Sequence, residues 1–137
     1  MFLPKDYVKN KKVLFSGRFD VPHLAHWVSV MRILHMGASK VVIVVLNYEG
    51  RTWPAQRAAQ FFDEVVYLSD LQTIVEVRIN NTHFAKITKK EFELYDCTRY
   101  IAGNNEVLHH IDSLGIRCVY MEPAYNIHAS RYILEKE

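Results

Sequence analysis

One stretch near the N-terminus reads Val13-Leu-Phe-Ser-Gly-Arg-Phe-Asp-Val-Pro-His-Leu-Ala-His26 and decides the fold. It starts with a short apolar run that closes on Gly17, a pattern typical of a strand buried on both faces. The residues from Ala25 to Met36 then place apolar side chains at helical spacing, and Gly37 stands where a helix-terminating glycine belongs. The stretch therefore predicts a strand, a tight turn and a helix, which is the first half of a βαβ unit.

The remaining sequence continues this alternation of strand and helix. Lys40–Leu46 predicts a second buried strand, Thr52 to about Phe62 a helix with proline in its first turn, and Glu64–Leu68 a third strand. The segment from Leu71 to Ile79 fits either an edge strand, because apolar and charged residues alternate, or the start of a helix. Further elements are expected at a capping box over Thr88–Glu91, a strand at Arg99–Ala102, a helix over Val107–Leu114, a strand at Arg117–Met121 and a closing helix from Ala129 to Glu137. This order predicts a single doubly wound, Rossmann-like α/β domain over residues 1–137, with a mostly parallel sheet.

Composition limits the classes of protein that this chain can represent. With 137 residues there is room for one domain, and 17 basic against 15 acidic residues leave a formal charge of +2, which argues against a nucleic-acid partner. The longest apolar run, Val41–Leu46, is far too short to span a membrane. We therefore expect no membrane partner. Two cysteines are too few for a disulfide framework, so we expect a cytoplasmic protein.

The ligand of a parallel α/β sheet binds beyond the carboxyl ends of the strands. Polar turns follow predicted strands at residues 16–26, at Asn104-Asn105 and at residues 122–130. The first turn carries two histidines, His23 and His26, which open the predicted helix and share one face of it. A helix N-terminus attracts phosphate, and imidazole N–H groups can donate to phosphate oxygens.

Two other interpretations of the histidine pair remain open. The rings could be partly buried structural groups, or they could belong to a metal site. A metal site would need a third ligand, and although Asp20 is near in sequence, no zinc spacing is present. We therefore expect no protein-held metal.

The same residues carry a resemblance to a known family. Gly17-Arg-Phe-Asp20 followed by His23-Leu-Ala-His26 resembles the G-x-F-D-x-x-H-x-G-H signature of the cytidylyltransferase-like nucleotidyltransferases, nearest to the glycerol-phosphate branch. Three later segments are similar to further family motifs. Phe61–Val65, with Arg57 ahead of it, is similar to the R-x-V-D-E-V segment that leads into a strand. Gly103–Asn105 is similar to the G-D-D turn, and Ile127–Ser130 to the terminal I-S-T-S motif.

The resemblance implies an enzyme that transfers a nucleotidyl group from a nucleoside triphosphate to a phosphorylated small molecule and releases pyrophosphate. It favours CTP as the nucleotide, with an ATP-dependent adenylyltransferase as the alternative, and Mg²⁺ bound with the triphosphate. By resemblance the catalytic residues are His23, His26, Arg51 and Ser130. The residues implied at the nucleotide are Gly17, Arg18, Phe19, Asp20, Asn104, Ile127 and His128. Arg57 and Trp53 are candidates for contact with the acceptor.

Some positions depart from the family pattern. The glycine between the two histidines is Ala25, an arginine of the family is Pro123, and two small hydroxyl residues are His128 and Ala129. Because of these departures, the alternative that the chain is a nucleotide-binding module without catalytic activity remains open. The short chain leaves acceptor recognition to loops near Arg51 and residues 80–90, or to a second subunit, so we expect a homodimer. His83, within that second loop, carries no signal of its own.

Overall fold

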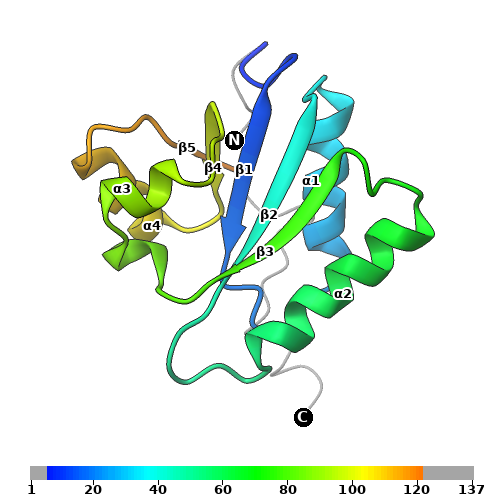
Figure 1. Ribbon diagram of the computed structural model, residues 1–137, viewed down its shortest axis with the longest axis horizontal. Helices are drawn as coiled ribbons and strands as arrows, with labels where there is room; N and C mark the ends of the chain where they lie inside the picture. Colours follow the sequence, from blue (N-terminus) through cyan, green and yellow to red (C-terminus); the bar gives the residue numbers. More distant parts are fainter. Residues whose placement is uncertain (1–5, 122–137) are drawn as a thin grey trace.

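The computed structural model describes residues 6–121, which form one five-stranded sheet with helices on both faces (Figure 1). Its strand order is β3-β2-β1-β4-β5, and every neighbouring pair is parallel. The strands are β1 (Lys12–Gly17), β2 (Lys40–Leu46), β3 (Val75–Asn80), β4 (Arg99–Ala102) and β5 (Val119–Tyr120). The order reverses once, between β1 and β4, as in doubly wound folds. The predicted Rossmann-like α/β class is therefore confirmed.

Alternate residues of the central strands enter two separate cores. Phe15 and Ile43 pack with α1 (Leu24–His35) and α2 (Ala55–Leu68) on one face of the sheet. Leu14 and Val42 pack on the other face, toward η1 (Phe84–Lys86), α3 (Lys89–Glu93) and α4 (Asn105–Ser113) (Figure 1). This covering of both faces explains why β2 is an unbroken run of apolar residues rather than an alternating one.

The prediction of a strand at Glu64–Leu68 is wrong, because these residues form the last turns of α2. Phe62 and Val66 lie four residues apart and are buried, whereas Leu68 is 83% exposed, as on an amphipathic helix. The third strand is instead β3, which forms one edge of the sheet beside β2. The likeness of Phe61–Val65 to a segment that leads into a strand therefore falls inside a helix.

The other predicted elements within residues 6–121 are present, β2 and β4 with the predicted bounds and the rest with shifted ends. Helix α2 begins at Ala55 with Pro54 as its N-cap, later than the expected start at Thr52. Thr88 caps α3, and its hydroxyl accepts from the Glu91 backbone N–H as in the predicted capping box, while the Glu91 carboxylate accepts from the Thr88 hydroxyl. The expected closing helix from Ala129 lies outside the described residues.

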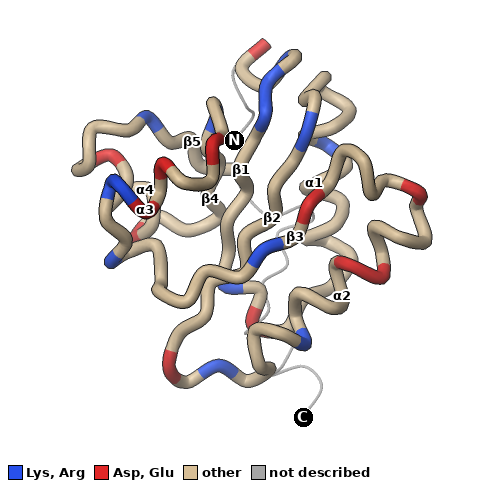
Figure 2. The backbone as a smooth tube through the Cα atoms, viewed as in Figure 1, with Lys and Arg blue, Asp and Glu red and all other residues tan. Residues whose placement is uncertain are grey.

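Charged residues of both signs are spread over the described chain. Figure 2 shows basic and acidic residues interspersed along the loops that follow β1 and β2, with neither sign dominating. Across residues 6–121, no helix is both long enough and apolar enough to cross a membrane.

Candidate active site

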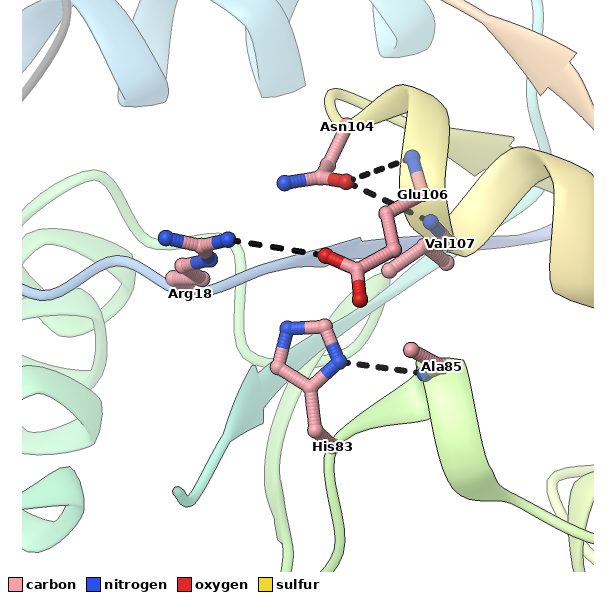
Figure 3. Close-up of polar contacts among 6 residues, drawn as sticks. All are labelled: Arg18, His83, Ala85, Asn104, Glu106 and Val107. Atoms are coloured by element: carbon pink, nitrogen blue, oxygen red, sulfur yellow. Dashed lines mark hydrogen bonds and ion pairs between the residues drawn. The ribbon is translucent and has the colours of Figure 1, made fainter. Parts of the chain in front are cut away.

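The turns after β1 and β4 lie where the strand order reverses. In the parallel pairing, Ser16 of β1 is level with Ala102 of β4, so the two strands end at the same edge of the sheet. Beyond that edge Arg18 reaches Glu106 at the start of α4, with Nη2 3.8 Å from Oε2 (Figure 3). Such a reversal opens the crevice in which folds of this class bind their ligands. The structure thus brings together two of the segments in which the sequence places nucleotide contacts.

The turn after β1 is built around Gly17 and Phe19. A β-carbon on Gly17 would lie 2.8 Å from Cζ of the Phe19 ring, which is closer than real side chains approach. Phe19 itself has φ +43°, a left-handed conformation that bulky residues rarely adopt. The glycine therefore makes room for an aromatic ring that the turn folds back over the end of β1.

The Phe19 ring supports one of the histidines. It is 4% exposed and packs edge-on against Phe62 of α2 and against His26, with ring centroids 4.9 Å and 5.1 Å apart. Phe15 of β1 adds a third edge contact at 5.7 Å. The position of the His26 imidazole is thus set by the hydrophobic core of the sheet through Phe19.

His23 and His26 form a reciprocal cap at the start of α1. His23 is the N-cap residue, and its Nδ1 accepts from the Ala25 backbone N–H at 3.2 Å. The backbone N–H of His23 donates to Nδ1 of His26, also at 3.2 Å. The two rings stack with centroids 4.1 Å apart and an angle of 25° between their planes. With each Nδ1 acting as acceptor, a neutral ring carries its proton on Nε2 and can donate from there.

Arg51 joins the loop after β2 to the turn after β1. Its guanidinium donates to four backbone carbonyls, those of Arg18, Phe19, Leu46 and Trp53. Burial lowers the pKa of Arg51, while the nearby Tyr48 and Asp20 act in the opposite direction. Arg51 therefore lies at the predicted site, and most of its N–H groups hold main chain in place.

Asp20 forms a second connection between the same two loops. Its carboxylate accepts from the Thr52 backbone N–H at 2.6 Å and from the Thr52 hydroxyl at 3.0 Å, with the Trp53 N–H at 3.4 Å. Together with Arg51, it makes the loops after β1 and β2 one connected unit.

The two acceptor-binding candidates lie against each other. The guanidinium of Arg57, on α2, sits 3.8 Å from the centroid of the Trp53 ring in a cation–π contact. Tyr48, which sequence reasoning missed, belongs to the same loop as Arg51, and the guanidinium groups of Arg51 and Arg18 lie 5.3 Å and 5.7 Å from its ring centroid. Burial raises the pKa of Tyr48, and the neighbouring Asp20 adds to the rise.

Asn104 provides a second helix N-terminus at this edge of the sheet. It is the N-cap of α4, and its Oδ1 accepts from the backbone N–H groups of Glu106 at 2.8 Å and Val107 at 3.3 Å (Figure 3). The positive ends of α1 and α4 thus both follow strands that flank the reversal.

His83 is a site residue that sequence reasoning missed. It lies in the loop after β3, its Nδ1 accepts from the Ala85 backbone N–H at 3.0 Å, and its ring stands below Arg18 and Glu106 (Figure 3). Residues 80–90 are expected to take part in acceptor recognition, but nothing in the sequence singles out His83 among them. The end of β3 at Asn80 supplies that signal, because ligands bind beyond the ends of such strands.

Three predicted site residues, Ile127, His128 and Ser130, lie outside the described residues, as do the departures at Pro123 and Ala129. Over residues 6–121, no group of three or more His, Cys, Asp or Glu side chains is placed to hold a metal ion.

Comparisons with known proteins identify no family. No protein-family model matches the chain, and no curated protein matches it significantly.

Proposed function

We propose that this chain is a nucleotidyltransferase that joins a nucleotide to a phosphorylated small molecule and releases pyrophosphate. One observation carries the proposal: two stacked histidines cap α1 directly after the central strand, beside the reversal of a parallel sheet. A helix N-terminus with two imidazole donors suits a polyphosphate, because it stabilises negative charge without a permanent countercharge.

The chemistry requires little beyond positioning. An oxygen of the acceptor phosphate forms a bond to the α-phosphorus of the triphosphate, while the bond from that phosphorus to the oxygen bridging to the β-phosphate breaks. Pyrophosphate leaves with the bonding electrons. A phosphate nucleophile is already ionised near neutral pH, so no general base is needed, and catalysis consists of alignment and stabilisation of charge.

Six residues of the site have a place in this scheme. His23 and His26 donate to the triphosphate, and Phe19 holds the His26 ring. Arg51 and Asp20 keep the two loops together, so in this proposal the role of Arg51 is mainly to position the main chain around the phosphates. Asn104 presents the N-terminus of α4 toward the nucleotide.

The Mg²⁺ of the proposed reaction would arrive with the triphosphate. Mg²⁺ in such sites is held mainly by substrate phosphates and water, with one or two carboxylates. Asp20 already accepts from Thr52 and Glu106 pairs with Arg18, so in this scheme substrate phosphates and water hold the ion. The bound ion would neutralise charge on the phosphates.

We favour CTP as the nucleotide, on the resemblance of the first turn to cytidylyltransferases, and ATP is the alternative. We place the reaction in the cytoplasm, where free thiols such as those of Cys97 and Cys118 persist.

The test is a matrix of substrates. The protein is incubated with Mg²⁺, each nucleoside triphosphate in turn and a panel of phosphorylated polyols and sugars, while pyrophosphate is measured. Release with one nucleotide and one acceptor class supports the proposal. Triphosphate binding by calorimetry without release for any pair would instead establish a nucleotide-binding module.

A further inference from the structure

One polar atom beside the crevice has no role in the scheme above. Nε2 of His83 has almost no exposed surface and no hydrogen-bond partner among the described residues. A buried N–H without a partner is unfavourable, and in native proteins such a group calls for an explanation.

The protonation of this ring follows from its contacts. Because Nδ1 accepts from the Ala85 N–H, the neutral ring carries its proton on Nε2. Burial lowers the pKa of His83, the cations Arg18 and Lys86 lower it further, and Glu106 opposes them. At neutral pH the ring is therefore uncharged and presents one N–H donor.

That donor is turned toward an acceptor on α4. Figure 3 shows Nε2 on the side of the ring turned toward Arg18 and the carboxylate of Glu106. Glu106 and Arg18 are joined only by a 3.8 Å ion pair, with side chains 65% and 50% exposed. Exposed pairs of this kind contribute little, so a ligand can displace the Arg18 side chain.

A donor and a carboxylate on facing sides suit a group that both accepts and donates hydrogen bonds, and a hydroxyl is the simplest of these. A hydroxyl can accept from the first and donate to the second at the same time, whereas a phosphate would be repelled by the carboxylate and a methyl group would leave both polar groups unpaired. Tyr48, whose ring meets the His83 ring edge-on at 5.9 Å, supports the imidazole from the side of the β2 loop.

We propose that Nε2–H of His83 and the carboxylate of Glu106 together bind a hydroxyl group of a sugar or polyol, with Arg18 moving aside as the ligand enters. This subsite rests on the proposed function, in which that hydroxyl belongs either to the ribose of the nucleotide or to the phosphorylated acceptor. It makes His83 and Glu106 residues that determine specificity.

The experiment compares ligands that differ by a hydroxyl, using calorimetry on the full chain. One arm uses CTP and ATP with their 2′-deoxy and 3′-deoxy forms, and the other uses glycerol 3-phosphate with propyl phosphate. The variants are His83→Asn, which keeps a capping oxygen for the Ala85 N–H but removes the Nε2 donor, and Glu106→Ala. Glu64→Ala, at an exposed position on α2, is the matched control.

In one of the two arms, either the nucleotides or the acceptor analogues, the native protein is expected to bind the hydroxylated ligand about 10- to 100-fold more tightly than its deoxy form. Both variants should bring that ratio close to one by weakening only the hydroxylated ligand, and Glu64→Ala should leave the ratio unchanged. The arm in which the ratio appears identifies the source of the hydroxyl.

Equal binding of both forms in both arms, or a ratio that survives both substitutions, overturns the subsite. Turnover separates this result from the proposed function. Pyrophosphate release without any hydroxyl preference rejects the subsite alone, whereas a His83-dependent preference without release rejects the enzyme and keeps the subsite. Failure of every ligand to bind rejects both.

Discussion

Gly17 and Phe19 share one space at the end of β1, since a β-carbon on the glycine would lie 2.8 Å from Cζ of the ring. The ring in turn packs against His26 with centroids 5.1 Å apart. The glycine and the aromatic residue of the first turn are therefore one packing unit, and this unit connects the central strand to the histidine pair.

Substitution of Gly17 by alanine should disturb that unit. We expect Gly17→Ala to lower the free energy of unfolding by about 1–3 kcal/mol, because the methyl group displaces the Phe19 ring from a tightly packed position. The measurement is urea unfolding followed by circular dichroism. Gly103→Ala is the control, since its β-carbon would meet only the Met121 carbonyl oxygen at 3.9 Å, an ordinary contact. Equal losses in both variants would contradict the packing argument.

Arg51 should not be replaceable by lysine. Its planar guanidinium donates to carbonyls from separate segments, and an ammonium group cannot reproduce that geometry. Arg51→Lys is expected to reduce the free energy of unfolding by about 1–3 kcal/mol, measured by the same urea titration. Arg32→Lys, at an exposed position on α1, should change it by less than about 0.5 kcal/mol. An unchanged free energy of unfolding in Arg51→Lys would show that the four hydrogen bonds do not hold the loops.

The corrected course of α2 can be tested by placing a charge at two nearby positions. Val66 is 4% exposed and Leu68 is 83% exposed, although both would face the same side of a strand. Val66→Asp should therefore prevent stable folding, because it buries an unpaired carboxylate. Leu68→Asp should have a melting temperature close to that of the native protein. Thermal unfolding distinguishes the cases, and similar effects at both positions would restore the strand interpretation.

Stability should fall in mild acid partly because of His83. Burial holds the pKa of this ring below its ordinary value, so the unfolded chain takes up a proton at a higher pH than the native protein does. Native stability is thus lost as the pH decreases through the ordinary histidine pKa of about 6.5.

The measurement for His83 is the free energy of unfolding between about pH 7.5 and pH 5, compared between the native protein and His83→Asn. The variant should show a smaller decrease. Thr73→Asn, at an exposed and non-titrating position between α2 and β3, is the control and should keep the native slope. An unchanged slope in His83→Asn would contradict the burial of a neutral ring.

The sequence was sufficient for the strands that are apolar on both faces. Val41–Leu46 admits few other structures, and it forms β2 as predicted. Val65 and Val66 misled because a β-branched pair on the buried side of a helix resembles a short strand, and only the packing of α2 on the sheet separates the two. The edge-strand alternative for Leu71–Ile79 is the correct one, since β3 spans Val75–Asn80.

The candidate site divides in a similar way. Local spacing was enough to place His23 and His26 on one face of a helix start, where the structure stacks them. The hydrogen-bond partners of Arg51 and Asp20 depend on how the loops after β1 and β2, which are far apart in sequence, pack together. A single sequence does not show which loops come into contact. The nearness of His83 to Arg18 and Glu106 depends on the path of the chain after β3 (Figure 3).

The central claim is that the histidine pair carries nucleotidyl transfer, and the most direct measurement is the rate of pyrophosphate release in variants that keep the helix cap. His23→Asn retains an N-cap oxygen and His26→Gln retains the reciprocal acceptor of a capping box, so both should fold. We expect each to lower turnover by about 10²–10³ while the melting temperature stays near native, with His35→Gln fully active. Near-native turnover in both His23→Asn and His26→Gln would contradict the account.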